Sequence, residues 1–191
     1  MNKATKINLK AVILAGGESR RMGQNKALLP LADKPLIAHA FSLLSAVFTE
    51  VFISGKAMDY AFLAPVYEDV EPNKGPMGGI YSALLSAQEP IFVCAFDMPF
   101  LNEKLIFSML QQYKEGYINV FQHKDNIYPT IGIYPYTILP ALYQAIQANQ
   151  LGLCQFLASQ KTHYIHDATI SSASLLNVNT KGDYFRAVSL L

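Results

Sequence analysis

The stretch AVILAGGESRRMGQNKALLPL, residues 11–31, changes abruptly from apolar residues to glycines and cations. Its first part, residues 11–15, is a continuous run of small and branched apolar side chains. A strand with one face in water alternates apolar and polar residues, whereas a strand covered on both faces does not. The run therefore predicts a buried strand, and the polar segment after it predicts a loop at the carboxyl end of that strand.

The loop combines glycines with positive charge. Its glycines are Gly16, Gly17 and Gly23, which permit a ligand to approach the backbone closely. Peptide N–H groups in such a loop can cradle phosphates, and Arg21 and Lys26 supply formal charge. The spacing fits neither the P-loop pattern GxxxxGK[ST] nor the dinucleotide pattern GxGxxG. The alternative is a tight turn whose cations lie on a solvated face, and the ordered spacing favours anion binding over it.

Strand and helix patterns alternate along most of the chain. Further strands are predicted at 50–54, 90–96, 116–122 and 127–134, and helices at 35–48, 77–87, 102–114 and 136–148. A helix near 151–159, a short strand near 162–165 and a final helix after residue 180 complete the pattern. Such alternation predicts a three-layer α/β/α, Rossmann-like fold with a mostly parallel central sheet, whose ligands bind at the carboxyl ends of the strands. No linker or repeat interrupts it, so we expect one domain over residues 1–191.

Composition excludes several classes of function. A net charge of +1 gives no broad basic surface for nucleic acid or for an anionic membrane. The first residues lack an apolar stretch long enough for a signal peptide or a membrane span. The two cysteines and four histidines show no metal-ligand spacing. We therefore expect a cytoplasmic protein that binds neither nucleic acid nor membrane, in which local charge carries any anion binding.

Asp97 follows the apolar strand at 90–96 and is expected at the same edge of the sheet as the opening loop. There a carboxylate could meet a hard cation and, through it, the phosphates of a nucleotide. The alternative is that Asp97 caps the turn into the helix at 102–114, which is a common role for Asp. The presence of the basic loop favours the first interpretation.

Five further motifs accompany the opening loop. They are VYEDV (66–70), GPMGGIYSAL (75–84), FVCAFDMPFL (92–101), YPTIGIY (128–134) and LLNVNT (175–180). In their order and spacing they resemble the motifs of GT-A-type nucleotidyltransferases. The LAGG form of the loop most resembles molybdenum cofactor guanylyltransferases, because related enzymes that use CTP typically have LAAG there. The resemblance spans nearly the whole chain.

The resemblance implies an enzyme that transfers GMP from GTP to the terminal phosphate of molybdopterin and releases pyrophosphate. It implies that Arg21 and Lys26 are catalytic residues on the triphosphate, and it gives Arg20 no such role. Asp97 would be the third catalytic residue and the ligand of Mg²⁺. The nucleotide-binding positions that it implies are Leu14, Ala15, Gly16, Gly17, Lys26, Ser54, Asp69, Gly79 and Asp97. Transient contacts with molybdoenzymes or other cofactor-biosynthesis proteins are also implied.

Several points stay open at the level of sequence. Guanine could be recognised by the Asp69 carboxylate, which can accept from its N1–H and its exocyclic amine, or by backbone groups of Leu14 and Ala15. Ser54 stands where guanylyltransferases often have Asn, and Tyr128 stands where many have His. The glycines of GPMGG either expose the N–H groups of a helix N-terminus to the nucleotide or form a tight, closely packed turn.

The NVNT segment places Asn177 and Asn179 on the same side of an extended chain, with Thr180 available to cap the final helix. In the family this segment borders the active site, so the resemblance implies Asn177 and Asn179 as substrate-binding residues. Related nucleotidyltransferases use an Asn or Asp hereabouts as a second metal ligand. Two rival functions remain. One is a cytidylyltransferase or another nucleotidyltransferase with a different phosphorylated acceptor, and the other is a non-catalytic GTP-binding module.

Overall fold

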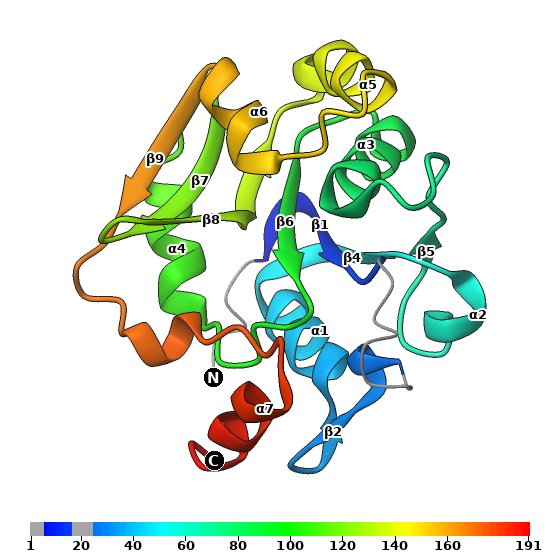
Figure 1. Cartoon of the computed structure of the whole chain (residues 1–191). Helices are drawn as coiled ribbons and strands as arrows, with labels where there is room; N and C mark the ends of the chain where they lie inside the picture. Colours follow the sequence, from blue (N-terminus) through cyan, green and yellow to red (C-terminus); the bar gives the residue numbers. More distant parts are fainter. Residues whose placement is uncertain (1–5, 17–24) are drawn as a thin grey trace.

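The computed structural model describes residues 6–16 and 25–191, which form a seven-stranded sheet with helices on both faces (Figure 1). The strands of the sheet are β1 (Ile7–Leu14), β4 (Phe48–Ser54), β5 (Val66–Tyr67), β6 (Ile91–Ala95), β7 (Ile118–His123), β8 (Asn126–Tyr134) and β9 (Thr162–His166). Their order across the sheet is β5-β4-β1-β6-β8-β7-β9. Only β8 runs antiparallel to its neighbours in this sheet, so the expectation of a mostly parallel central sheet is confirmed.

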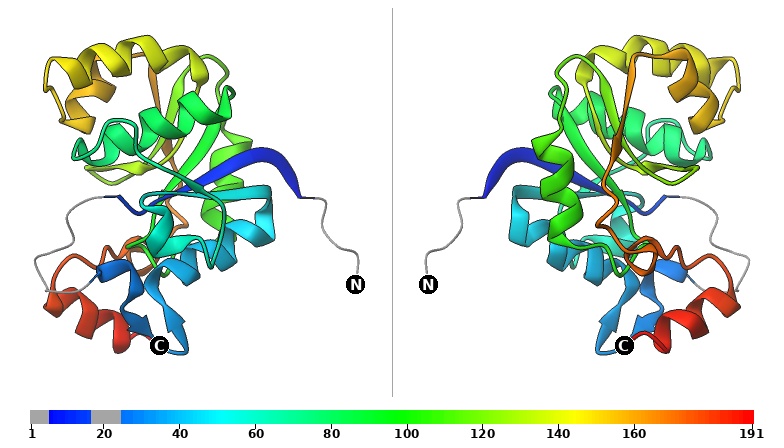
Figure 2. Two further views of the ribbon diagram at one scale, coloured as in Figure 1. Left: turned by 90° about the vertical axis from the view of Figure 1, so that its right-hand side faces the viewer. Right: turned by 90° about the vertical axis from the view of Figure 1, so that its left-hand side faces the viewer.

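The helices form the outer two layers. They are α1 (Leu36–Val47), α2 (Ala57–Tyr60), α3 (Gly75–Ala87), α4 (Glu103–Gln111), α5 (Leu139–Gln147), α6 (Leu153–Ser159) and α7 (Lys181–Val188). Buried residues of α1 and α4 belong to one core cluster, and those of α3, α5 and α6 belong to a second. Figure 2 shows the sheet edge-on between these two groups. The three-layer α/β/α expectation is therefore confirmed.

The apolar residues 11–14 of β1 contact both helical layers. Ala11 and Ile13 belong to the core cluster of α1 and α4, whereas Val12 and Leu14 belong to the cluster of α3 and α5. Successive side chains of a strand point to opposite faces, so a strand between two helical layers needs apolar residues at every position. Buried polar groups would otherwise require partners in both layers.

The register of three parallel strands forms the edge that carries the site. Leu14, the last residue of β1, pairs with Ser54 of β4 on one side and with Ala95 of β6 on the other. The three strands therefore end level with one another. The segments that follow them leave the sheet at the same edge, which is where ligands bind in open α/β sheets.

A few elements differ from the sequence-based expectation. β1 begins at Ile7 rather than near residue 11, because the polar-containing segment INLK also pairs with β4. The two-residue strands β2 (Pro30–Leu31) and β3 (Lys34–Pro35), which form a separate hairpin, were not predicted. The four residues of α2 were not predicted either. Elements this short carry no readable periodicity. In the part of the chain that the structure describes, no helix is both long and apolar enough to cross a membrane.

Gly132 offers a test of the packing of β8 between β6 and β7. A Cβ atom at Gly132 would lie 2.8 Å from the carbonyl oxygen of Asn119 and 3.0 Å from Val120 Cγ1. We expect Gly132→Ala to lower the free energy of unfolding by about 1–3 kcal/mol, because the backbone of β7 must shift to accept the methyl group. The matched control is Gly182→Ala on exposed α7, where the nearest atom would be 3.6 Å away. Chemical denaturation should show that variant unchanged or stabilised, by up to about 1 kcal/mol, and equal stabilities for the two variants would contradict the prediction.

Candidate functional site

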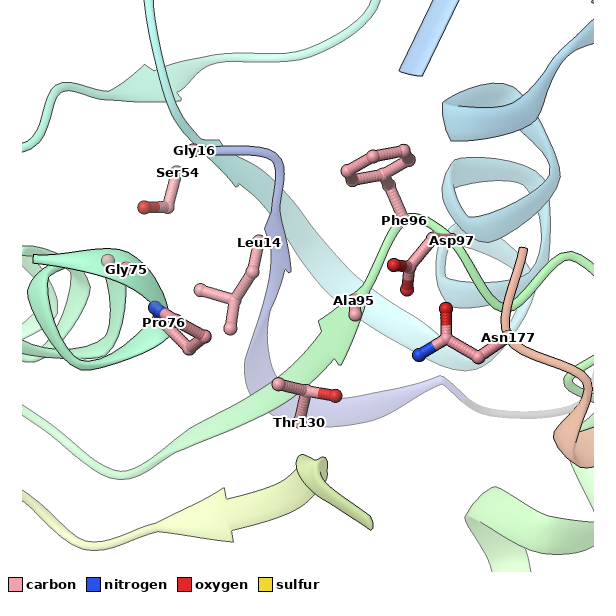
Figure 3. A pocket seen from close by; sticks show the side chains of 11 residues that line it. Leu14, Gly16, Ser54, Gly75, Pro76, Ala95, Phe96, Asp97, Thr130 and Asn177 are labelled. Atoms are coloured by element: carbon pink, nitrogen blue, oxygen red, sulfur yellow. The ribbon is translucent and has the colours of Figure 1, made fainter. Parts of the chain in front are cut away.

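A cleft of about 220 Å³ lies at the carboxyl ends of β1, β4 and β6. The described residues that line it are Leu14, Gly16, Ser54, Gly75, Pro76, Gly79, Ala95, Phe96, Asp97, Thr130 and Asn177. Figure 3 shows Ser54 and the start of α3 on one side of Leu14, and Asp97 and Asn177 on the other. A larger groove of about 540 Å³ between α5 and α6 is lined by no charged residue, so it offers nothing to hold a triphosphate.

Lys26 lies at the Asp97 end of this cleft, buried in a network of hydrogen bonds. Its Nζ donates to Asp97 Oδ2 at 3.2 Å and to Asn179 Oδ1 at 2.9 Å, and it lies 5.3 Å from the centre of the Phe96 ring. The side chains of the ion pair are only 10% and 15% exposed, so water screens their attraction weakly. Burial raises the pKa of the Asp97 carboxyl above its ordinary value, and Lys26 opposes this shift.

The local chain explains how Lys26 reaches this position. Residues Lys26–Leu28 form a short 3-10 helix, and the Asn25 side chain caps it by accepting from the backbone N–H of Ala27 at 3.1 Å. Asn25 is itself held by Tyr60, since its Nδ2 donates to the Tyr60 hydroxyl at 3.1 Å. The start of Lys26's segment is thus fixed by a side chain from α2.

Asp97 does not cap the following helix. The N-cap of α4 is Asn102, whose Oδ1 accepts from the backbone N–H of Leu105 at 3.1 Å. The alternative interpretation of Asp97 as a helix cap is therefore wrong. Its carboxylate is left for Lys26 and for a ligand in the cleft.

The NVNT segment is tied to Asp97 through its backbone. The N–H of Val178 donates to the carbonyl oxygen of Asp97 at 2.8 Å, and the Val178 side chain is 1% exposed in the core. Since alternate side chains of an extended segment point to opposite sides, Asn177 and Asn179 both point toward the cleft. Thr180 then caps α7 and shares a reciprocal capping box with Asp183, as the sequence predicts for Thr180.

Two buried oxygen atoms at this end of the cleft have no hydrogen-bond partner among the described residues. They are Asp97 Oδ1 and Asn177 Oδ1, and Figure 3 shows the side-chain oxygen of Asn177 facing Asp97. Buried polar groups are normally satisfied, so these two oxygens have the capacity to bind a ligand. A carboxylate and an amide oxygen are donors of the kind that a hard divalent cation takes, with phosphates and water completing its shell. The described residues hold no cluster of three or more His, Cys, Asp or Glu side chains, so a cation here would depend on Asp97.

A second carboxylate, that of Asp69, lies next to the opposite end of the cleft, against Ser54 and Gly16, although Asp69 does not itself line the cleft. The hydroxyl of Ser54 donates to Asp69 Oδ1 at 2.9 Å. Burial raises the pKa of the Asp69 carboxyl, and the hydrogen bond from Ser54 lowers it in part. A Cβ atom at Gly16 would lie 2.7 Å from Asp69 Oδ2, so the other carboxylate oxygen lies against the backbone at the end of β1.

The backbone groups of Leu14 and Ala15 are already engaged. The N–H of Ala15 donates to the carbonyl oxygen of Ser54 at 2.8 Å, and the carbonyl of Ala15 accepts from the Tyr60 hydroxyl at 3.2 Å. The carbonyl of Leu14 accepts from the N–H of Phe96 at 3.3 Å. Of the two sequence-level alternatives for reading a base, the Asp69 carboxylate therefore has more free accepting capacity than these backbone groups.

The glycines of GPMGG lie at the cleft and also allow close packing. Gly75 begins α3, and Gly75 and Gly79 line the cleft. A Cβ atom at Gly79 would lie 2.8 Å from the Ser54 hydroxyl oxygen, so this glycine also permits close packing of α3 on β4.

Other site residues expected from the sequence lie outside the cleft or outside the described residues. Gly17, Arg20 and Arg21 fall in residues 17–24, which the structure does not describe. Tyr128 packs against the Phe121 ring in the core rather than lining the cleft.

Phe96 and Thr130 line the cleft, although sequence reasoning did not single them out. Both fall in apolar blocks that read as ordinary strands. Phe96 ends its block, whereas Thr130 lies in the middle of residues 127–134, so its place in the sequence does not distinguish it.

Comparison with known proteins gives a consistent result. Residues 11–164 match the family described as MobA-like NTP transferase domain. The probable molybdenum cofactor guanylyltransferase of Carboxydothermus hydrogenoformans is 34% identical over 190 residues, which are 96% of this chain and 96% of that protein. The molybdenum cofactor guanylyltransferase of Syntrophotalea carbinolica is 31% identical over 184 residues, or 91% and 88% of the two chains.

Solved structures share the fold. Molybdopterin-guanine dinucleotide biosynthesis protein A from Archaeoglobus fulgidus has a TM-score of 0.81 at 22% identity, covering 95% of this chain and 98% of that chain. The 4-diphosphocytidyl-2C-methyl-D-erythritolsynthase from Anaerococcus prevotii has a TM-score of 0.70 at 14% identity, covering 96% and 95%. At these identities the two structures show the fold alone.

The ion pair between Lys26 and Asp97 leads to a prediction about the affinity of the protein for a divalent cation when no nucleotide is present. Lys26 neutralises Asp97 and repels a second cation, so Lys26→Met should tighten Mn²⁺ binding about 10-fold, the scale of one like-charge contact removed from a partly buried site. Isothermal titration of the protein with Mn²⁺ alone at pH 8 measures this.

Asp97→Ala is the control for that titration, since it should abolish the tight site in both backgrounds. Unchanged or weaker Mn²⁺ binding by the Lys26→Met protein would contradict the predicted competition.

Proposed function

The chain belongs to the family of MobA-like NTP transferase domains, and on this premise we propose that it transfers GMP from GTP to the terminal phosphate of molybdopterin, forming molybdopterin guanine dinucleotide and pyrophosphate. Relatives that match over nearly the whole chain are named molybdenum cofactor guanylyltransferase. The chain is accordingly a nucleotidyltransferase. The observation that carries the proposal is the convergence of a buried lysine, a carboxylate and two amides at one end of a cleft that has a second carboxylate at its other end.

The reaction needs no protein nucleophile. A phosphate oxygen of molybdopterin attacks the α-phosphorus of GTP, the new P–O bond forms, and the bond to the β-phosphate oxygen breaks as pyrophosphate leaves. The protein contributes positioning and neutralisation of the charge on the transferred and leaving groups. We assign Lys26 to the phosphates, because its ammonium group lies 3.2 Å from Asp97, which lines the cleft. We assign Arg21, which precedes it in the sequence, to the same triphosphate.

The two unpartnered oxygens, Asp97 Oδ1 and Asn177 Oδ1, fit a divalent cation, and we propose Mg²⁺ as the ion that they hold. Bound there, Mg²⁺ would neutralise phosphate charge. Asn179 has a separate role in the proposal, because its Oδ1 holds the Lys26 ammonium in place.

The Ser54 end of the cleft suits the base. Guanine presents an N1–H and an exocyclic amine on one edge, and a carboxylate can accept from both donors at once. We assign this role to Asp69, with Gly16 and Gly79 leaving room for the nucleotide beside Leu14 and Ala15. Gly17, which lies outside the described residues, is proposed as a further nucleotide-binding position. Molybdopterin would then approach from the Asp97 side, where Thr130 and Asn177 line the cleft. Hand-over of the product implies transient contacts with molybdoenzymes.

Release of pyrophosphate tests the proposal directly. With Mg²⁺ and molybdopterin present, we expect release from GTP, and little from CTP, ATP or UTP. No release is expected from GTP when molybdopterin is left out, since the acceptor supplies the nucleophile. CTP as the preferred substrate would establish a cytidylyltransferase instead. Binding of GTP with no release in the complete mixture would establish a non-catalytic module.

Arg20 and Arg21 are neighbours in the sequence, so a comparison of their variants tests whether Arg21 contacts the triphosphate. Arg21→Ala should lower kcat/KM about 10²- to 10³-fold, the scale of losing one well-placed charged donor, and Lys26→Ala should do the same. Arg20→Ala removes the same charge from the adjacent position and should leave kcat/KM within about threefold. Steady-state kinetics with GTP measures all three, and similar losses for Arg20→Ala and Arg21→Ala would refute the assignment.

A further inference from the structure

Ser54 is a buried polar residue that lines the cleft. It is the last residue of β4, paired with Leu14 of β1 on one side and with Tyr67 of β5 on the other. Its carbonyl accepts from the N–H of Ala15, and the residue is 0% exposed. A Cβ atom at Gly79 would lie 2.8 Å from the Ser54 hydroxyl oxygen, so the absence of a side chain at Gly79 leaves this hydroxyl room beside α3. The backbone from which the hydroxyl extends is therefore fixed in the sheet.

The single proton of that hydroxyl is given to Asp69. The Ser54 Oγ lies 2.9 Å from Asp69 Oδ1, in the range of a good hydrogen bond to a carboxylate. A hydroxyl has one proton to donate, so that proton is not available to a ribose or a base while this bond exists. Ser54 can therefore donate to Asp69 or to a nucleotide, but not to both at once.

Asp69 needs such an anchor because its own segment does not fix it. It lies beyond the end of β5 in a stretch that is neither helix nor strand. The next residue, Val70, is held through its N–H, which donates to the Ser82 hydroxyl at 3.0 Å. Among the described residues, Ser54 is the one that donates a hydrogen bond to the Asp69 side chain.

The anchored carboxylate presents its second oxygen to the cleft edge. Asp69 Oδ2 lies where a side chain on Gly16 would be, 2.7 Å from the position of such a Cβ atom, and Gly16 lines the cleft. The absence of a side chain at Gly16 keeps this oxygen accessible from the end of β1. Ser54 therefore fixes one oxygen of the carboxylate, which keeps a second lone pair, and the other oxygen lies at the cleft edge, so both can accept from the base.

We infer that Ser54 is a positioning residue for base specificity: it holds the Asp69 carboxylate in the orientation that accepts from the N1–H and the 2-amino group of guanine, and it gives its one proton to that carboxylate rather than to the nucleotide. The inference rests on the proposed use of GTP and adds a residue that acts through another. Its consequence differs from that of the proposed function: loss of the Ser54 hydroxyl should lower the preference for GTP over inosine triphosphate (ITP) more than it lowers the rate of guanylyl transfer.

Inosine triphosphate is the probe, because it keeps the N1–H of guanine and lacks the 2-amino group. Affinities for GTP and ITP with Mg²⁺ are measured by calorimetry, and kcat and KM are then measured with molybdopterin. The wild-type protein should prefer GTP about 10- to 100-fold, the scale of a hydrogen bond to a charged acceptor. Ser54→Ala should reduce this preference about 5- to 10-fold through a higher KM for GTP, with kcat within about twofold.

Three further variants separate positioning from general damage. Asp69→Asn should bring GTP and ITP to nearly equal affinity, and Ser54→Cys, whose thiol is a weaker donor of similar size, should lie between wild type and Ser54→Ala. Ser108→Ala removes another buried hydroxyl, on α4, and should leave the preference unchanged. If Ser54→Ala does not fold, as judged by circular dichroism, the Ser54→Cys protein decides the question alone.

Failure of this inference is distinguishable from failure of the proposed function. A wild-type preference for GTP that survives in Ser54→Ala and Ser54→Cys would overturn the role of Ser54 while leaving guanylyl transfer intact. Equal wild-type affinity for GTP and ITP would overturn it as well. Absence of pyrophosphate release by the wild-type protein would instead refute the transfer reaction, and the calorimetric comparison would still report on Ser54.

Discussion

The ion pair between Lys26 and Asp97 joins the parts of the chain that form the site. A buried ammonium and a buried carboxylate are each unfavourable alone, and their separation would leave two uncompensated charges. Asn179 completes the arrangement as an uncharged acceptor for the same ammonium. Segments from the start, the middle and the end of the sequence are thereby held at one edge of the sheet. Because burial weakens solvent screening, this contact counts for more than an ion pair on the surface would.

The fold supplies the precision that this contact needs. The ends of β1, β4 and β6 are level, so the side chains that follow them start from a fixed frame. Val178 adds a backbone hydrogen bond to Asp97 and buries its side chain, which leaves the two flanking asparagines no other side to face. Site residues that extend from rigid strands and from short, anchored segments can hold a ligand geometry with little reorganisation.

Much of this could be predicted from the sequence, for identifiable reasons. Continuous apolar strands such as residues 11–15 and amphipathic helices such as α4 are long enough for their periodicity to be read. The carboxyl-end rule then places Asp97 near the opening loop. The bond between Lys26 and Asn179 spans 153 residues of sequence, and no local pattern announces it. The sequence does not show either that Asn102, and not Asp97, caps α4, because both residue types cap helices well.

The two carboxylates of the cleft are compensated in opposite ways, and this difference explains how one cleft can serve two chemical tasks. Asp97 is paired with a formal positive charge, so a ligand cation must compete with Lys26 for it, and phosphates that draw the ammonium away would favour that exchange. In the part of the chain that the structure describes, Asp69 is held by a neutral hydroxyl, so its charge stays available to neutral donors such as those of a base. If the partners of the two carboxylates were exchanged, neither cation binding at Asp97 nor base binding at Asp69 would be favoured. A lysine beside Asp69 would consume its accepting capacity, and a serine beside Asp97 would leave the buried carboxylate uncompensated in the absence of ligand.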